Sequence, residues 1–252
     1  MFSAKDVVIK PITSQAANDL VKRVHYSGKV VNNSVLHFGA YLGGNLEGAM
    51  SFGGSIDKRK VLPLVSGTSW NGMLELNRMA FSDRLPRNSE SRCMAIAFKM
   101  IKKHYPHIEW VLSFADGCQC GDGTIYRAAG FVLTGLKTNK TMLLTPTGEV
   151  VADKTFNNSA DKKYKGLKKS QCKPLVGYQL RYIYFLNPEA RRRLTVPVLP
   201  FSKIDEIGAG MYKGKPKRVK QANSGDQLES GGAAPTHTLQ SSAEVSNVSQ
   251  TT

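Results

Sequence analysis

Apolar and polar residues alternate along the first 135 residues in two different periods. Short runs rich in β-branched and aromatic residues predict strands at 6–10, 35–42, 46–52, 73–81, 110–115 and 131–133. Apolar positions spaced three to four residues apart predict a helix capped by Thr13 or Ser14 and ended by Gly28, and further helices at 90–105 and 124–129. This mixed order, β-α-β-β-β-α-β-α-β, favours an α+β fold over a regular doubly wound sheet.

The strand at 110–115 is apolar throughout, a pattern typical of strands buried on both faces. It leads into Asp116 and a glycine-rich loop at 116–123. Ligands gather at the carboxyl ends of strands where strand order changes. Asp116 is therefore a candidate to accept a proton, orient a nucleophile or bind a metal, although aspartate is also a common turn residue.

The loop before the helix at 90–105 predicts an anion site. Backbone N–H groups and the helix dipole favour negative charge at a helix N-terminus. Arg87 and Arg92 add positive charge there, and Ser89 and Ser91 add hydroxyl donors. A pyrophosphate suits this place, but an ordinary helix with Ser89 as its N-cap explains the same residues.

Two further side chains are candidates for chemistry. His25 continues the inward stripe of the first helix and precedes Tyr26, while Tyr126 lies in the first turn of the short helix. Each has a structural explanation, as a hydrogen-bonded core histidine and a packed tyrosine. Together with Asp116 they could instead form a base or a ligand set for a redox metal such as iron. Sequence spacing does not decide whether these groups meet.

Cysteine and hydropathy patterns exclude several classes of protein. Four cysteines in 252 residues are no disulfide framework and fit a reducing cytoplasm. Cys118 and Cys120 lack the second ligand pair of a zinc site. No apolar run approaches the roughly 18 residues of a membrane span, and residues 1–6 lack a signal core.

Positive charge is concentrated in the first 222 residues. The chain has 35 Lys and Arg against 19 Asp and Glu, a net charge of +16. Residues 223–252 carry −3, so the remainder carries +19. Such a field attracts polyanions, nucleic acid being the common partner and acidic lipid the rival. The basic residues form three clusters, at 162–173, 191–193 and 213–220.

Composition predicts three segments. Residues 1–135 form a core that contains the candidate site residues, and 136–212 form a basic, β-rich extension of the same domain. Residues 213–252, rich in Ser, Gly, Thr, Gln and Ala, form a disordered tail.

The order of elements resembles the core of GNAT-type acyltransferases, whose closing helix ends in a Tyr-x-x-x-Gly-Phe pattern like Tyr126-Arg127-Ala128-Ala129-Gly130-Phe131. More narrowly, the chain resembles the Mom DNA-modification proteins of Mu-like phages. The blocks that carry this resemblance are 25–27, 74–78, 85–92, 110–116 and 123–131. The similarity covers most of residues 20–135 and fades after about residue 190.

The resemblance implies a GNAT-like three-layer fold with a mostly antiparallel, splayed sheet. It also implies a transferase that converts adenine in double-stranded phage DNA to its N6-carbamoylmethyl (acetamido) form, which hides the DNA from host restriction enzymes. An acyl-CoA-type donor such as acetyl-CoA, iron, and the host cytoplasm as location are implied as well. The oligomeric state, monomer or homodimer, stays open.

The resemblance also assigns roles to residues. His25, Tyr26, Asp116 and Tyr126 become the reactive centre, with His25 and Tyr26 as tentative metal ligands. The cofactor contacts are Arg78, Arg87, Ser89 and Ser91.

Two observations separate this chain from an ordinary GNAT enzyme. The usual pyrophosphate loop contains glycines, whereas residues 87–92 contain none. Simple acyl transfer would also give an amide at N6, whereas the carbamoylmethyl product needs a bond to a methylene carbon.

Two alternative functions stay open. One is a GNAT N-acetyltransferase acting on a small amine or protein lysine, and the other is a nucleic-acid-binding protein with a degenerate acyltransferase fold.

Overall fold

We describe the chain from a computed structural model, which covers residues 2–153, 156, 164, 166–212 and 215–217. Residues Met1–Val219 form one compact unit. A second unit, Lys220–Thr252, lies outside the described residues, and so does most of the predicted tail at 213–252.

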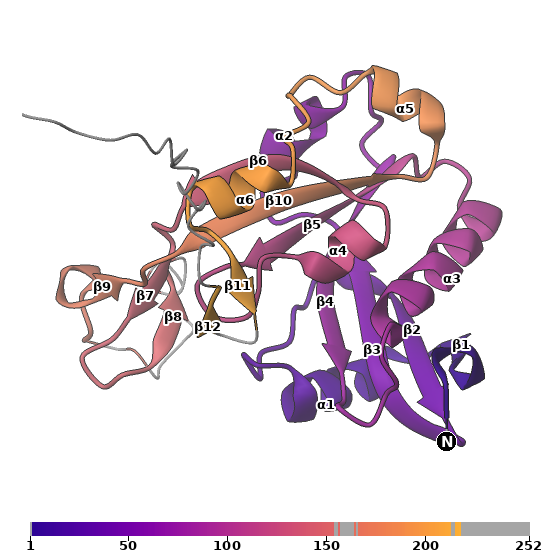
Figure 1. Cartoon of the computed structure of the whole chain (residues 1–252), viewed down its shortest axis with the longest axis horizontal. Helices are drawn as coiled ribbons and strands as arrows, with labels where there is room; N and C mark the ends of the chain where they lie inside the picture. Colours follow the sequence, from indigo (N-terminus) through magenta and orange to yellow (C-terminus); the bar gives the residue numbers. More distant parts are fainter. Residues whose placement is uncertain (1, 154–155, 157–163, 165, 213–214, 218–252) are drawn as a thin grey trace, which may run out of the picture. The chain divides into compact units, whose positions relative to one another are not determined.

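A seven-stranded sheet forms the centre of the molecule (Figure 1). In spatial order its strands are β1 Val8–Pro11, β2 Ser34–Leu42, β3 Asn45–Gly53, β4 Met73–Phe81, β5 Trp110–Asp116, β10 Tyr178–Phe185 and β6 Val132–Thr138. Neighbouring strands are antiparallel, except for the parallel pair β4 and β5. The predicted α+β class with a mostly antiparallel sheet is therefore confirmed.

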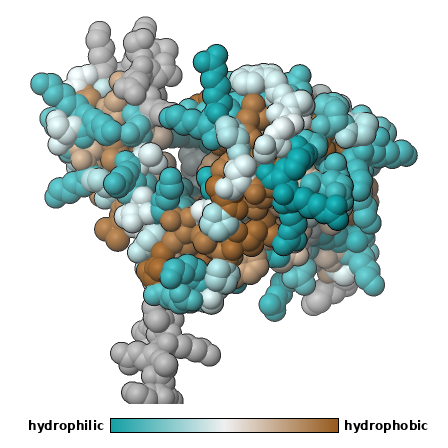
Figure 2. Space-filling view, turned by 90° about the horizontal axis from the view of Figure 1, so that it is seen from above, coloured by the Kyte–Doolittle hydropathy of each residue, from teal (hydrophilic) through white to brown (hydrophobic). Residues whose placement is uncertain are grey.

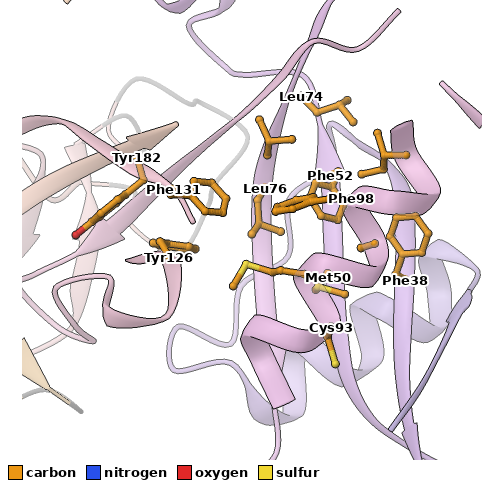
Figure 3. Packing of buried hydrophobic residues seen from close by; sticks show 14 of the residues in the cluster. Phe38, Met50, Phe52, Leu74, Leu76, Cys93, Phe98, Tyr126, Phe131 and Tyr182 are labelled. Carbon is orange, nitrogen blue, oxygen red and sulfur yellow. The ribbon is translucent and has the colours of Figure 1, made fainter. Parts of the chain in front are cut away.

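Helices cover both faces of this sheet. They are α1 Ser14–Val24, α2 Lys58–Val61, α3 Ser89–His104, α4 Thr124–Ala128, α5 Pro188–Arg192 and α6 Ser202–Glu206. Figure 3 shows the face that packs against α3 and α4, where Phe98 and Tyr126 meet core residues such as Leu76. We call the opposite face, packed against α1, α2 and α5, the α1 face. No helix in the described ranges is long and apolar enough to span a bilayer.

The remaining elements are small. Strands β7 Met142–Leu144, β8 Val150–Ala152 and β9 Lys173–Pro174 form a separate sheet, and β11 Met211–Tyr212 pairs with β12 Lys215–Pro216. Short 3-10 helices lie at Ala4–Asp6, Leu62–Leu64 and Lys169–Gln171.

The two long helices begin where the periodicity predicts them. The predicted end of the first helix at Gly28 is wrong, because α1 ends at Val24 and His25 is its C-cap with an extended backbone. Thr13 caps α1 by accepting a hydrogen bond from the Ala16 N–H at 3.3 Å, and the inward stripe of Ala17, Leu20 and Val21 is buried. In α3 the buried stripe is the expected one, from Met94 to Ile101. Burying each large apolar side chain contributes about 1.5–3 kcal/mol, so the stripes fix which side of each helix faces the sheet.

The sheet splays between β4 and β5. The two strands pair only where Met73, Leu74 and Glu75 lie beside Trp110, Val111 and Leu112. Beyond that point they diverge, as Figure 1 shows, and the rest of β5 pairs with β10 alone. The C-terminal half of β5 therefore lies at the open end of the splay.

Strand β10 is inserted between β5 and β6. It pairs with β5 from Gln179 to Phe185 and with β6 from Tyr178 to Ile183. Strand β6 itself crosses position 135, where the sequence places the end of the core. The two predicted segments thus share one sheet.

A β-bulge in β4 sets the direction of Arg78. Phe52 of β3 pairs with Leu76, but the next residue back, Ser51, pairs with Arg78. Asn77 is therefore the extra residue of a bulge, a device that redirects side chains. Leu76 points into the core beside α3, and without the bulge Arg78 would share that side. With it, Arg78 lies on the α1 face.

One residue of β5 departs from the sequence prediction. The apolar run predicts burial on both faces, and five of the seven strand residues are buried. Phe114, however, is 43% exposed. The reason is that α2 and α5 cover Trp110 and Leu112 on this face but do not extend over Phe114.

Hydrophobic surface is unevenly distributed over the molecule. Figure 2 shows one area where it gathers, bordered by hydrophilic residues. The large apolar side chains that are most exposed include Val176, Val35, Ile56 and Phe2, and Phe114 is exposed to a smaller degree, 43%.

Replacing Gly123 with alanine is expected to destabilise the fold strongly. Gly123 caps α4 with φ +84°, and a Cβ there would lie 2.5 Å from the Tyr182 ring. That ring is fully buried, so the variant suffers both backbone strain of about 1–2 kcal/mol and overpacking of about 1–3 kcal/mol. Urea unfolding measures the loss.

Gly44→Ala is the matched control for this prediction. Gly44 has nearly the same φ, +83°, but a Cβ there meets nothing within 4 Å. It should therefore carry the backbone strain alone. Equal losses of unfolding free energy in the two variants would contradict the clash with Tyr182.

Candidate active site

The Asp116 carboxylate is held at the end of β5 by several donors. Its Oδ1 accepts hydrogen bonds from the Cys118 backbone N–H and from Gln179 Nε2, both at 3.0 Å. Its Oδ2 accepts one from Gln119 Nε2 at 2.7 Å and one from the Tyr26 hydroxyl at 3.4 Å. Asp116 therefore stabilises the turn through the Cys118 N–H and also contacts the candidate residue Tyr26. Its carboxylate is held in one orientation.

Tyr26 approaches Asp116 from the end of α1. About half of this residue is exposed, but desolvation of its hydroxyl, followed by the nearby Asp116 charge, raises the pKa of Tyr26. The phenol therefore stays protonated at neutral pH and donates its hydrogen bond to the carboxylate.

His25 lies beside Tyr26, with 4.4 Å between the ring centroids. Its Nδ1 accepts a hydrogen bond from the Ser27 backbone N–H at 3.2 Å and lies 2.8 Å from the Ser27 hydroxyl. The pKa of His25 is lowered to about 4, mainly because the imidazole is buried and secondly because the Arg78 charge is near. The imidazole is therefore neutral at pH 7 with its proton on Nε2, because Nδ1 acts as an acceptor.

Arg78 lies with these residues on the α1 face. Its Nε donates to the Lys29 carbonyl at 2.8 Å and its Nη1 to the Asn77 carbonyl at 2.7 Å. Its charge acts on His25 and Tyr26. The resemblance implies Arg78 as a cofactor contact, and the bulge in β4 places it on the same face as Asp116.

Tyr126 is a packed residue whose hydroxyl faces the same region. Only 8% of it is exposed, and its ring packs against Phe131 at 5.2 Å and Tyr182 at 5.3 Å (Figure 3). Burial raises its pKa, and Ser113 and Arg78 are near enough to oppose that shift.

The structure places Tyr26 against Asp116, although the two residues are 90 positions apart in the sequence. His25, the sequence neighbour of Tyr26, packs its ring on Tyr26. Tyr126 acts on Tyr26 electrostatically, while its ring packs against Phe131 and Tyr182. The four predicted reactive-centre residues come from three segments that meet at the splay of the sheet. Gln119 and Gln179, which orient Asp116, were missed by the sequence analysis because no local pattern marks them.

The turn before α3 differs from the predicted helix cap. Asn88, not Ser89, is the N-cap, and its φ of 68° is left-handed. Asparagine tolerates this conformation better than most residues, so it takes a position that glycine would otherwise fill. The Ser89 side chain is fully buried and donates to the Pro86 carbonyl at 2.6 Å, so it is engaged in the turn itself.

The other two predicted residues of this turn lie nearer the solvent. Arg87 is exposed, and the Ser91 hydroxyl donates weakly to the Asn88 carbonyl at 3.3 Å. The start of α3 therefore presents a cation, a hydroxyl and the helix dipole.

The two residues that the resemblance implies as iron ligands, His25 and Tyr26, each have protein partners. Nδ1 of His25 is engaged with Ser27, and the protonated Tyr26 hydroxyl is engaged with Asp116. Within the described ranges, no group of three or more His, Cys, Asp or Glu residues gathers to hold a metal. Cys118 and Cys120 are free thiols, and burial raises the pKa of Cys118 to about 11.

A separate hollow of about 630 Å³ lies between α1 and the turns at the ends of β3 and β4. Its lining includes Asp19, Arg23, Glu47 and Arg84. None of the predicted site residues lines it, so the chemistry and this hollow occupy different places.

Comparisons with known proteins agree on one family. A family model described as the Mom protein family matches residues 6–203. The methylcarbamoylase mom of Escherichia phage Mu is 35% identical over 210 residues, which cover 80% of this chain and 86% of that protein.

Solved acyltransferase structures show a more distant similarity. An IAA acetyltransferase from Bacillus cereus is 13% identical with a TM-score of 0.42, covering 71% of this chain and 99% of its own. An N-acyl amino acid synthase from uncultured soil microbes is 16% identical with a TM-score of 0.45, covering 75% and 95%.

Proposed function

Because the chain belongs to the Mom protein family, we propose that it is a DNA-modifying transferase. In this proposal it converts adenine in phage DNA to N6-carbamoylmethyl adenine in the host cytoplasm and so protects that DNA from restriction enzymes. The observation that carries the chemistry is the contact between Tyr26 and Asp116, with Tyr126 and Arg78 beside them.

The reaction needs a base because adenine N6 is a poor nucleophile. Its lone pair is delocalised into the ring, so attack is favoured when an N–H proton is removed as the new bond forms. Asp116 is the proposed acceptor of that proton. Its four hydrogen-bond donors hold the carboxylate in one orientation, as a positioned base requires.

The bonds balance for a donor of the class X–CH2–C(=O)NH2. The bond from N6 to the methylene carbon forms, one N6–H bond and the CH2–X bond break, and X leaves with the electron pair. Tyr126 is proposed to donate a hydrogen bond to X, because its raised pKa keeps the phenol protonated. Arg78 is proposed to stabilise the negative charge that develops on X.

His25 and Tyr26 are proposed to position the base. The imidazole packs against the Tyr26 ring, and the Tyr26 hydroxyl contacts the Asp116 carboxylate. No step of this reaction is assigned to iron.

A thioester transfers its acyl group through the carbonyl carbon, so the acyl-CoA-type donor that the resemblance implies does not by itself fit this step. The donor is therefore proposed to be a CoA-type molecule in which X is the CoA sulfur, bonded to the methylene carbon, and whose phosphates lie at the start of α3. The start of α3 would attract the phosphates through Arg87, the Ser91 hydroxyl and the dipole of this 16-residue helix. Ser89 is omitted from this set because its hydroxyl is committed to Pro86.

The direct test is the nucleoside content of DNA from cells that express the full chain. Nuclease digestion and mass spectrometry should reveal an adenosine in which a carbamoylmethyl group replaces one amino hydrogen. Cells carrying the empty vector are the control. Normal adenosine alone, despite abundant folded protein, would contradict the proposal, and acetyl-CoA turnover without DNA would support the N-acetyltransferase alternative.

A further inference from the structure

An exposed aromatic ring lies on the strand that carries Asp116. Phe114 is 43% exposed, whereas its neighbours Ser113 and Ala115 are buried. Side chains two residues apart on a strand point to the same face, so Phe114 lies on the α1 face with Asp116. It lies in the part of β5 that β4 no longer pairs with.

The uncovered position of Phe114 follows from the arrangement of helices. Helices α2 and α5 cover Trp110 and Leu112 at one end of the α1 face. At another part of that face, α1 packs over Ala49 of β3. Phe114 lies beyond both covers, so its ring is open to solvent on the same face as Asp116.

The groups around this ring are polar and fixed in place. Phe114 pairs across the sheet with Arg181, whose guanidinium donates to the Thr134 carbonyl at 2.7 Å and to the Thr134 hydroxyl at 3.1 Å. That guanidinium lies against Gly135, where a Cβ would come within 3.2 Å of it. A flat apolar surface is thus bordered by an immobilised cation and, further along the strand, by Asp116.

We propose that Phe114 is the platform on which the target purine stacks after it leaves the DNA duplex. This inference rests on the proposed function and names the base-binding surface of that same site. Enzymes that act on a base inside a duplex extrude it and hold it against aromatic or apolar side chains. A base stacked on Phe114 would direct its exocyclic amine along the strand toward Asp116, about 7 Å away at the strand repeat.

Tyr26 completes this surface. It is half exposed and its hydroxyl contacts Asp116, so its ring borders the place where the amine would react. The site therefore combines one ring for the base, one carboxylate for the amine and one phenol that orients the carboxylate.

The test compares four variants in cells that express equal amounts of the full chain. Phe114→Ala and Phe114→Leu remove the planar ring, and Phe114→Tyr and Phe114→Trp retain one. We expect the initial rate of modified-adenine formation to fall about 10- to 100-fold in the first pair, from the usual strength of base–aromatic stacking. The second pair should stay near the wild-type rate. A purely structural role for apolar bulk would instead leave Phe114→Leu active as well.

Tyr105→Ala is the matched control. Tyr105 is a similarly exposed aromatic residue, 41%, at the C-terminal cap of α3, and it has no part in the proposed site. Its loss should leave the rate unchanged. Binding of the purified Phe114→Ala protein to a duplex without adenine should also be unchanged, because phosphate contacts are retained.

The outcomes separate this inference from the function on which it rests. If wild-type protein makes no modified adenine, the proposed function fails. If wild-type protein is active and Phe114→Leu equals it, the stacking platform is wrong while the function stands. A loss of affinity for the adenine-free duplex that matches the loss of rate would also overturn it, by making Phe114 a general DNA contact.

Discussion

Raising the salt concentration from 50 to 200 mM is expected to weaken the binding of this protein to duplex DNA by roughly 10³–10⁵-fold, the range for about 6–10 phosphate contacts. The reason is the net positive charge of the chain, which has 35 basic and 19 acidic residues. All of the basic residues lie within the first 222 positions. Fluorescence anisotropy of a labelled duplex at several salt concentrations gives the slope.

Two controls accompany the salt series. Circular dichroism over the same range should show an unchanged fold, so that lost binding is not lost structure. Vesicles of acidic lipid test the rival partner. A flat salt dependence for DNA, or equally tight binding to the vesicles, would contradict nucleic acid as the target of the positive charge.

Changing Asp116 to asparagine should lower the rate of adenine modification by about 10²–10⁴-fold, the usual contribution of a positioned acid or base. Asparagine keeps the size of the side chain and one carbonyl oxygen for its donors, but it cannot take up the proton from N6. Mass spectrometry of DNA from expressing cells measures the rate.

Asp205→Asn provides the comparison. This exposed aspartate on α6 undergoes the same loss of charge outside the proposed site. Both variants should bind duplex DNA at least as well as wild type, since each removes one negative charge. Wild-type product levels in Asp116→Asn would show that another group takes the proton.

The fold was predictable where the sequence is periodic over several turns. Thr13 and the stripe through Leu20 define α1, and a comparable stripe defines α3. The short helices α2, α5 and α6 were not predicted, because four or five residues contain little more than one turn and no measurable period. Tertiary contacts, such as those that bury Val61 and Ala190, hold two of them in place.

The candidate site was only partly predictable. Residue types and strand ends pointed to Asp116 and Tyr126. The contact between Tyr26 and Asp116 could not be predicted from spacing, because the two residues are 90 positions apart in the sequence. Gln179 reaches the carboxylate through strand pairing that no local pattern encodes. The apolar run at 110–115 predicted that Phe114 is buried, but Phe114 is exposed. Such a departure from the sequence pattern is expected near functional sites.

The position of β10 between β5 and β6 has a consequence for how the protein is made. Until the ribosome has added Phe185, the nascent chain cannot supply the strand that pairs with β5 along its length. The edge that bears Asp116 is therefore open while the 69 residues from 117 to 185 are added, which at about 5–20 residues per second takes roughly 3–14 seconds. Chaperones that shield unpaired strand edges should bind fragments ending near residue 140 and release the chain once residues up to 185 have emerged.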